Sequence, residues 1–495
     1  MPRFAEEIMN RVFRGRGCAL VVLTLLALFP AAARADESVH ILSSSNIDSG
    51  DTAWMLTSTA LVLMMTGPGL ALFYGGLVRR KNVLATMMHC FILMALVSVL
   101  WAIIGYSLAF DVGNPFIGGL HFAFLRNVGV APCEYAPTIP HTAWMAYQMM
   151  FAIITPALIC GAYAERMKFS SMLVFSSAWL LLIYCPMAHM VWGKGGLFSS
   201  GFVGAKIPAC DFAGGTVVHI SSGVSALVCA IFLGRRRGYR THPMPPHSVV
   251  LSIVGAAMLW IGWFGFNAGS ALHANGLAAY AFLNTHLATA GGALGWMIVE
   301  WIKTKKPTVL GAISGAVAAL VVITPAAGFT LPMWAMLMGF CGGVFCFFTA
   351  TSLKHAFGYD DALDAFGVHG AGGTLGAILT GVFAVAAVNV PVAFGSIAKL
   401  GLIEGNFTTI LHQLAAVAVA WAIAAVGSFF ILSIVNVMMG LRVSEADEYE
   451  GLDLSQHGES GYNIEDAFSA TYAGGGATLI NGESNASKRE ALAGT

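Results

Sequence analysis

Apolar residues fall into eleven long stretches that alternate with short polar segments. A typical bilayer core is about 30 Å thick, and an α-helix needs about 20 apolar residues to cross it. Strands of an outer-membrane barrel would instead alternate polar and apolar residues in segments of about ten. The pattern therefore predicts an all-α integral membrane protein with eleven transmembrane helices. The expected spans are residues 54–78, 84–110, 141–164, 170–192, 212–233, 248–270, 277–302, 308–327, 331–353, 367–388 and 409–440.

Composition agrees with a membrane protein. Hydrophobic residues make up 57% of the 495 positions and charged residues only 10%, whereas soluble globular proteins carry about 25% charged residues. The formal net charge is zero, so nothing in the charge balance indicates a nucleic-acid partner. The 57 glycines indicate closely packed helices, because small residues let transmembrane backbones approach one another.

The N-terminus has the layout of a secretory signal peptide. Arg11, Arg14 and Arg16 precede the apolar run 19-ALVVLTLLALF-29 and the small-residue stretch 31-AAARA-35. We expect residues 1–35 to be removed by a cut after Ala35. The alternative is an uncleaved first helix, but the run is too short for an ordinary span. Residues 36–440 then form the membrane domain.

The basic residues indicate the orientation of the spans. With the mature N-terminus outside, fourteen Lys and Arg residues fall on the predicted inner side. The outer side holds only Arg126, Lys194, Lys206 and Lys399. Cytoplasmic loops carry the excess of Lys and Arg, so we expect a multi-pass protein of the inner (plasma) membrane with its C-terminus in the cytoplasm. Cys133 and Cys210 both fall in outer loops, and a disulfide between them stays open.

Two histidines occupy matching positions in apolar segments. In 211-DFAGGTVVHISSG-223, His219 follows Asp211 by eight residues, and in 361-DALDAFGVHGAGG-373, His369 follows Asp361 by eight residues. At 1.5 Å per residue each imidazole would lie roughly 12 Å into the membrane, from opposite faces. The histidines are therefore expected to meet near the midplane. The spacing also predicts an inverted repeat, five helices against five, with one extra helix.

The alternative for each histidine is a buried residue satisfied by a neighbouring carbonyl. Ionisable groups at membrane depth are costly and usually face a pathway or cavity, which favours a functional pair. Asp211 and Asp361 are expected to cap helix starts, and Asp211 also has a secondary role in attracting cations. A metal site needs three or four ligands, and no third ligand lies at matching depth. We therefore expect no metal and no cofactor.

Four runs resemble the ammonium transporter family (Amt, Mep and Rh), most closely its bacterial Amt branch. They are 186-PMAHMVWGKGG-196, 211-DFAGGTVVH-219, 260-WIGWFGFNAGSA-271 and 366-FGVHGAGG-373. The resemblance extends from about Asp51 to Tyr462. It implies a homotrimer with one pore per subunit that transports ammonium or ammonia across the lipid bilayer and is not an enzyme.

The resemblance also implies a role for each pore residue. Ammonium would be recognised at an outer site, pass a gate of two phenylalanines as it loses its proton, and cross the pore as ammonia or as the ion bonded to the paired histidines. Whether the proton moves separately stays open. Tyr147 stands where bacterial members commonly have Phe. The residues are Trp192, Ser270, Tyr147 and Asp211 for recognition, Phe151 and Phe266 for the gate, and His219 and His369 for the pore.

Chemistry supports these roles, since a Trp face attracts cations and a Ser oxygen accepts an N–H. Two other classes stay open. One is an ammonium sensor with little flux, and the other is a membrane enzyme that uses the two histidines as metal ligands.

The charged segment 441–463 resembles the family's cytoplasmic regulatory tail. That tail implies control by a PII-type signal protein (GlnK-like), and a solvated tail without a partner is the alternative. Residues 464–495 diverge from the family. The runs 474-GGG-476 and 481-NGESNAS-487 have a composition typical of disordered segments.

Overall fold

A computed structural model describes residues 41–462 of the chain. The predicted signal peptide, with its cut after Ala35, and the predicted disordered segment 464–495 lie outside these residues. Within residues 41–462 the chain is helical, and the extended pairings are confined to isolated bridges such as Ile41 with Cys133.

Eleven helical segments account for the membrane domain, which confirms the predicted fold class. Nine segments within the described residues are long and apolar enough to cross a membrane. The helix α13 is shorter, and α12 carries the polar run Asn284, Thr285 and His286 in its first half. The first five segments are Ser49–Leu77 (α3, α4), Arg80–Phe110 (α5, α6), His141–Tyr163 (α7), Phe169–Trp192 (α8, α9) and Gly215–Leu233 (α10). The other six are Val249–Gly269 (α11), Gly276–Thr304 (α12), Val309–Ile323 (α13), Pro332–Phe357 (α14, α15), Phe366–Phe383 (α16) and Thr408–Met439 (α17).

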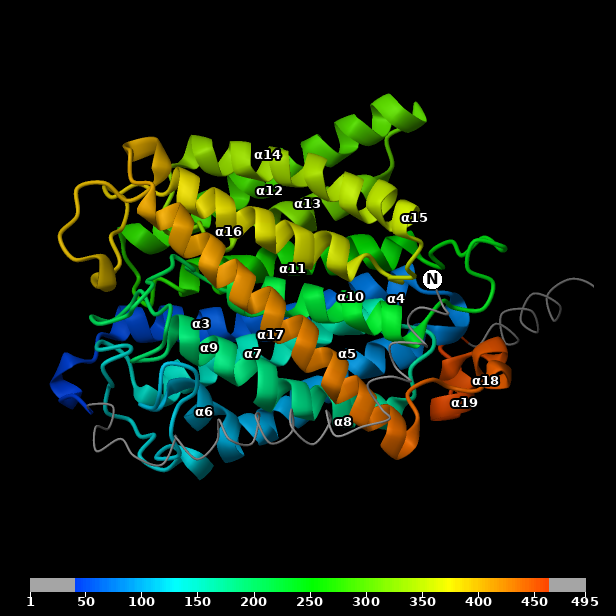
Figure 1. Cartoon of the computed structure of the whole chain (residues 1–495), viewed down its shortest axis with the longest axis horizontal. Coiled ribbons are helices and arrows are strands. Elements are labelled where there is room, and N and C mark those ends of the chain that lie inside the picture. Colours follow the sequence, from blue (N-terminus) through cyan, green and yellow to red (C-terminus); the bar gives the residue numbers. More distant parts are fainter. Residues whose placement is uncertain (1–40, 463–495) are drawn as a thin grey trace, which may run out of the picture.

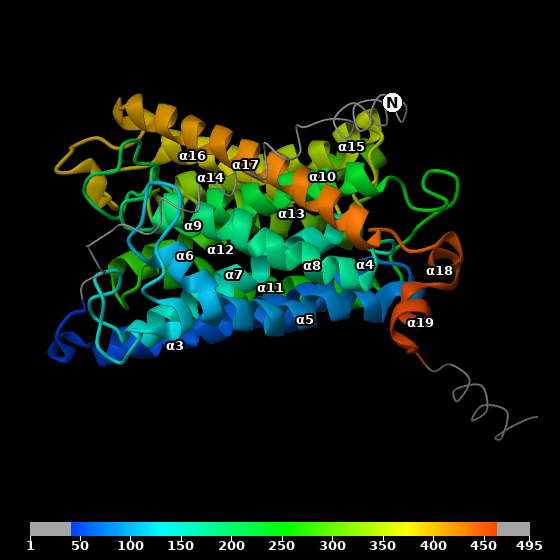
Figure 2. The same ribbon diagram turned by 60° about the horizontal axis from the view of Figure 1, so that its bottom comes forward.

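The helices lie side by side along the long axis, and α17 crosses the others obliquely (Figure 1). Two short helices, α18 (Glu445–Glu450) and α19 (Leu452–His457), lie at one end of the bundle, which we call the tail end (Figures 1 and 2). The opposite end carries the long connections 111–140, 193–214 and 384–407 and is called the loop end. The molecule therefore presents two different ends on either side of its apolar bundle.

The segment that carries His219 begins later than the sequence indicated. Residues 212–214 are not helical, and the segment starts at Gly215 as a π-helix that runs to Ile220. The second histidine segment is likewise a π-helix, Phe366–Gly370, preceded by a turn. The predicted depth of roughly 12 Å for each histidine assumed a continuous α-helix from the acid onward, whereas the helical segments begin at Gly215 and Phe366. The order of acid, turn, π-helix and histidine is nevertheless shared by both segments.

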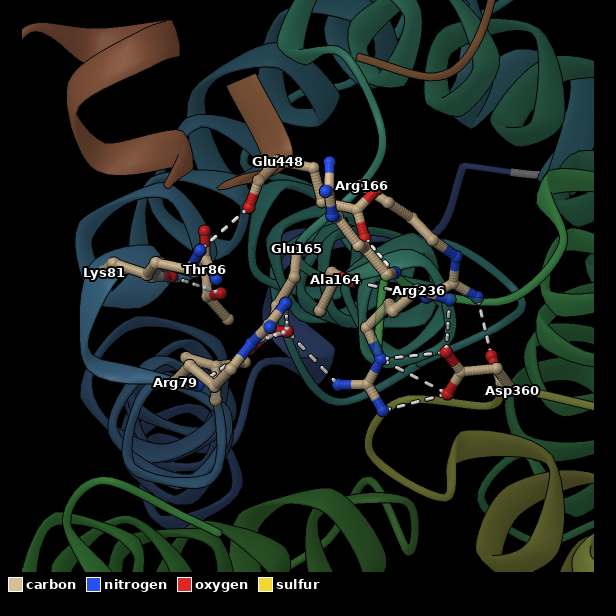
Figure 3. A network of polar contacts seen from close by, with 12 residues as sticks. Arg79, Lys81, Thr86, Ala164, Glu165, Arg166, Arg236, Asp360 and Glu448 are labelled. Atoms are coloured by element: carbon tan, nitrogen blue, oxygen red, sulfur yellow. Dashed lines mark hydrogen bonds and ion pairs between the residues drawn. The ribbon is translucent and has the colours of Figure 1, made fainter. Parts of the chain in front are cut away.

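Buried ion pairs join the connections at the tail end. Figure 3 shows Arg236 between Glu165 and Asp360, with Arg236 Nη2 2.9 Å from Asp360 Oδ1 and Arg236 Nη1 3.4 Å from Glu165 Oε2. Arg79 Nη2 lies 2.6 Å from the same Glu165 oxygen. Burial alone would raise the pKa of Glu165, but the charges of Arg236 and Arg79 outweigh burial and lower it. Four connections that are far apart in sequence are thereby fixed to one another.

The segment 441–462 is docked on this end by specific hydrogen bonds. Asp453 Oδ1 accepts the backbone N–H of Ala85 at 2.8 Å, in the first turn of α5, where a carboxylate offsets unpaired amides. Asn82 Oδ1 accepts the N–H of Leu452 at 2.8 Å. Glu448 Oε2 accepts Arg442 Nη2 at 2.7 Å. The two tail helices are thus part of the folded domain.

Cys133 and Cys210 are both buried free thiols in the structure. The disulfide left open by the sequence is therefore absent. Cys210 lies beside Gln413 of α17, whose Oε1 accepts the Cys210 N–H at 2.8 Å. Cys133 belongs to a turn in which its carbonyl accepts the Ala136 N–H at 3.0 Å.

Glycines let the two histidine segments touch. A Cβ atom added at Gly223 of α10 would lie 1.9 Å from the backbone nitrogen of Gly370, the residue after His369. A Cβ at Gly373 would lie 2.9 Å from the Cβ of His219. Because backbone cannot move aside as a side chain can, these positions fix the distance between the two segments.

We expect Gly223→Ala to destabilise the protein by about 3 kcal/mol, at the upper end of overpacking costs, because the new methyl group meets backbone. Thermal unfolding of the purified protein in detergent measures the effect. Gly276→Ala is the matched control, because a Cβ at Gly276, at the start of α12, meets nothing within 4 Å. Equal stability of both variants would contradict this account of the packing.

Candidate permeation pathway

A cavity of about 290 Å³ opens at the loop end. Trp192, Ser270, Tyr147 and Phe151 line it, so four of the six residues predicted from the sequence to act at the outer site and the gate meet at one place. Asp211 is also part of its lining. We call this space the outer cavity.

Trp192 ends α9 and forms one wall of the outer cavity. Its Nε1 donates to the carbonyl of Asp211 at 3.0 Å, which fixes the indole. The ring meets that of Phe151 edge-on, with centroids 5.9 Å apart and planes at 88°. Among aromatic side chains, the face of a Trp ring attracts a cation most strongly, and partial burial strengthens that attraction.

Ser270 and Tyr147 place two hydroxyl oxygens on the opposite wall. Ser270 Oγ donates to the carbonyl of Phe266 at 2.8 Å, which leaves its lone pairs for an incoming donor. Tyr147 Oη lies 2.9 Å from the carbonyls of Gly265 and Phe266 and 3.2 Å from Ser270 Oγ. The tyrosine hydroxyl therefore fixes the position of the serine.

Two stacked phenyl rings close the floor of the outer cavity. Phe151 of α7 and Phe266 of α11 have centroids 4.1 Å apart and planes at 22°. Both side chains are almost fully buried. Rings in this arrangement leave no passage for a hydrated ion without side-chain movement.

The two histidines lie below the rings. His219 Nδ1 and His369 Nδ1 are 3.2 Å apart, and the imidazole planes are inclined by 22°. A neutral imidazole has one donor and one acceptor nitrogen, so this contact requires opposite tautomers. His219 Nε2 is buried and has no hydrogen-bond partner within residues 41–462. That nitrogen is a polar atom that a small solute in the pathway can satisfy.

The histidines separate a narrow apolar space from a second wide cavity. The narrow space measures about 10 Å³ and is lined by both histidines, Phe266 and aliphatic residues such as Leu259. The second cavity, about 270 Å³, opens toward the tail end and also includes His369. Cavity, ring pair, narrow space, histidine pair and cavity therefore follow one another through the bundle.

Asp211 and Asp361 lie at the starts of the two histidine segments. The Asp211 carboxylate accepts the backbone N–H groups of Gly214, Gly215, Thr216 and Val217 at 2.7 to 3.3 Å. Burial raises the pKa of Asp211 above its ordinary value, although these amides act in the other direction. Its oxygens are occupied by a helix start, and its contact with the cavity is secondary.

Asp361 has the corresponding position at the other end. Its Oδ2 accepts the N–H of Phe366 at 2.7 Å, at the first residue of the π-helix that carries His369. Burial and the neighbouring charge of Asp364 raise the pKa of Asp361 to about 6. The two acids thus start the two histidine segments in the same way.

The structure adds two features that the sequence analysis did not assign. Trp263 stacks on His219, with centroids 5.5 Å apart and planes at 21°. The sequence could have indicated that Trp263 faces the pathway, because it precedes Phe266 by three residues on α11 and residues three apart share a helix face. Glu134 also lines the outer cavity. No spacing connects it with Trp192, since Glu134 lies in the connection 111–140 and Trp192 ends α9.

Within the described residues, no group of three or more His, Cys, Asp or Glu side chains is placed to hold a metal ion. The pathway joins an aromatic-walled entrance, a constriction and a pair of imidazoles in contact.

Comparison with known proteins agrees with this geometry. The model of the Ammonium Transporter Family matches residues 53–462. An ammonium transporter of Bacillus subtilis is 51% identical over 413 residues, which are 83% of this chain and 98% of that protein. An ammonium transporter of Aquifex aeolicus is 43% identical and covers 89% of this chain and 98% of its own length.

Solved structures show the same fold. The crystal structure of Saccharomyces cerevisiae Mep2 has a TM-score of 0.75 and 37% identity, over 81% of this chain and 89% of that chain. A structure described as a sensor Amt protein has a TM-score of 0.74 and 24% identity, over 82% of this chain and 98% of that chain, which shows a common fold alone. By the family match and these identities, the chain belongs to the ammonium transporter family.

Proposed function

We propose that this protein recruits ammonium at the outer cavity, removes its proton and conducts ammonia between the two histidines to the tail end. The observation that carries the proposal is the alignment of cavity, stacked rings and imidazole pair in one pathway. The cavity serves recruitment, the ring pair excludes hydrated ions, and the imidazole pair offers hydrogen-bond partners inside the apolar bundle.

Recruitment uses the two walls of the outer cavity. The Trp192 face attracts the cation by roughly 0.5–2 kcal/mol, and Ser270 Oγ accepts one of its N–H groups. Potassium is about as large as ammonium, but it has no N–H to donate and no proton to lose. The site therefore favours ammonium through directional bonds that potassium lacks.

Passage beyond the rings favours the neutral form. The narrow space below Phe266 is apolar apart from the histidine nitrogens, and a charge there would lose its hydration without a counter-charge. Ammonia needs only hydrogen-bond partners, and the pair of opposite tautomers offers both a donor and an acceptor. A shared proton between the imidazoles can be handed on without placing two charges side by side.

Replacement of either histidine tests this mechanism. We expect His219→Ala and His369→Ala to lower methylammonium uptake into proteoliposomes at least about tenfold, or to let potassium through, because the polar groups of the narrow space are lost. Uptake and membrane current are measured together on the same vesicles.

A conservative variant separates loss of the imidazole from loss of side-chain volume. His219→Gln replaces the imidazole with an amide that still offers a donor and an acceptor, and it controls for an emptied cavity. If His219→Ala and His369→Ala both matched the unsubstituted protein in flux and in potassium rejection, the paired-histidine mechanism would be wrong.

The Ser270 and Tyr147 hydroxyls give a graded prediction. Ser270→Ala removes the direct acceptor and should raise the KM for methylammonium about tenfold, as expected for one hydrogen bond to a charged group. Tyr147→Phe removes only the group that holds Ser270 and should raise KM less, by about threefold. Uptake measured over a range of concentrations gives both values. A larger effect for Tyr147→Phe than for Ser270→Ala would reverse these roles.

We also propose a homotrimer, in which another copy covers the face formed by α11 and α12. Phe264 and Phe282 stack on this face at 3.9 Å. The exposed His286 lies beside Trp260 at 5.4 Å and has no hydrogen-bond partner within residues 41–462. A polar ring directed at lipid near the middle of a span is costly, and a second copy removes that cost.

We further propose that the loop end faces outward and the tail end faces the cytoplasm of an inner-membrane protein. Arginines gather at the tail end, including Arg79, Arg166 and Arg236 (Figure 3), as expected for the inner side. The tail is then accessible to a cytoplasmic PII-type protein.

Binding of a PII-type protein is expected to depend on the docked tail. We expect the full-length protein in detergent to retain a PII protein in a pull-down, and ATP and 2-oxoglutarate to change the amount retained. Asp453→Ala should weaken retention severalfold, because it removes the bond to Ala85 that holds α19. Glu459→Ala, at an exposed position, is the control. Absence of retention under all conditions would refute this regulation.

A further inference from the structure

A pair of opposite charges lies at the rim of the outer cavity. Lys194 Nζ lies 3.0 Å from Glu134 Oε1 and 3.1 Å from Oε2. Both side chains are partly exposed, at 24% for Lys194 and 20% for Glu134. Glu134 lines the cavity together with Trp192 and Ser270. The pair is therefore placed where a cation enters from solvent.

The surrounding backbone fixes the pair in this position. Tyr135, next to Glu134, accepts the backbone N–H of Lys194 through its hydroxyl at 2.8 Å. The Tyr135 ring stacks on Trp144, with centroids 5.7 Å apart and planes at 12°. Lys194 itself follows the end of α9 by two residues. The two charges are thus held by the same elements that hold the recognition tryptophan.

The two carboxylates that line the cavity differ in their accessibility to solvent. Two acidic residues line it, Glu134 and Asp211, and the Asp211 carboxylate is occupied by four backbone amides. Glu134 is therefore the carboxylate of this lining that solvent and an entering cation can reach. Its partner Lys194 carries the charge that repels the same cation.

We propose that the Glu134–Lys194 pair sets the rate at which the outer cavity captures cations, with Glu134 collecting them and Lys194 limiting the collection. This inference rests on the proposed transport of ammonium. A charge at the rim of a binding site acts mainly on capture and its salt dependence, and a narrow mouth concentrates its field. The pair acts on entry, and the pathway beyond the rings is unaffected by it.

Opposite neutralisations should therefore have opposite effects. We expect Glu134→Gln to raise the KM for methylammonium by about threefold or more, and Lys194→Gln to lower it by a similar factor, since the two charges act in opposite directions on the entering cation. The double variant should return close to the unsubstituted value. The maximal rate should stay unchanged in all three, and the shifts should shrink in 0.5 M salt, where the Debye length is only about 4 Å.

Gln replaces the charge of either side chain with a neutral polar amide and is isosteric with Glu, and thermal unfolding verifies the fold of each variant. Lys206→Gln is the matched control, because it removes an exposed lysine of the same connection that forms no ion pair with Glu134, the partner of Lys194 within the described residues. Its KM should match that of the unsubstituted protein.

Each outcome has a distinct meaning. Shifts of opposite sign that cancel in the double variant support the inference. Shifts of the same sign in both single variants, without rescue in the double, show that the pair is a structural contact and overturn it, as do unchanged KM values. If the unsubstituted protein takes up no methylammonium, the proposed function fails instead, independently of this pair.

Discussion

The structure depends on one contact, the 3.2 Å approach of two imidazole nitrogens inside an apolar bundle. Each imidazole alone would be a costly polar group at this depth. Together they satisfy one nitrogen each and leave His219 Nε2 without a partner within the described residues. That remaining nitrogen defines a place for a small hydrogen-bonding solute. A pair that satisfied both nitrogens of both rings would be stable and inert.

The contact imposes conditions on the rest of the fold. The two π-helices approach each other closely enough that a Cβ at Gly223 would meet the backbone of Gly370. Each begins at an acid that accepts free backbone amides, Asp211 for one and Asp361 for the other. Stacking of Trp263 on His219 then fixes the ring orientation. The glycines, the two acids and Trp263 thus position the histidine segments.

The sequence was sufficient for some of these features and not for others. The length of the apolar stretches predicts the spans, because the thickness of the membrane sets how long a spanning helix must be. The repeated spacing from acid to histidine predicts that His219 and His369 approach each other. The start of the His219 segment was placed too early, because residues 212–214 are not helical and the Asp211 carboxylate accepts the amides that follow. Glu134 was missed for a different reason. Its place in the same cavity as Trp192 depends on how the connection 111–140 folds against the end of α9, and no local pattern of residues encodes that.

The two halves of the pathway solve different electrostatic problems. At the entrance the cation is still partly hydrated, so weak features suffice: an indole face, a hydroxyl and a rim pair of net charge zero. Beyond Phe151 and Phe266 the surroundings are apolar, and no carboxylate lies in the lining of the narrow space to balance a cation. In the proposed mechanism, a strong anionic site at the entrance would hold ammonium too tightly to release it into such a pore. The modest entrance and the uncharged interior both fit that proposal, in which the solute gives up its proton before it crosses the apolar space.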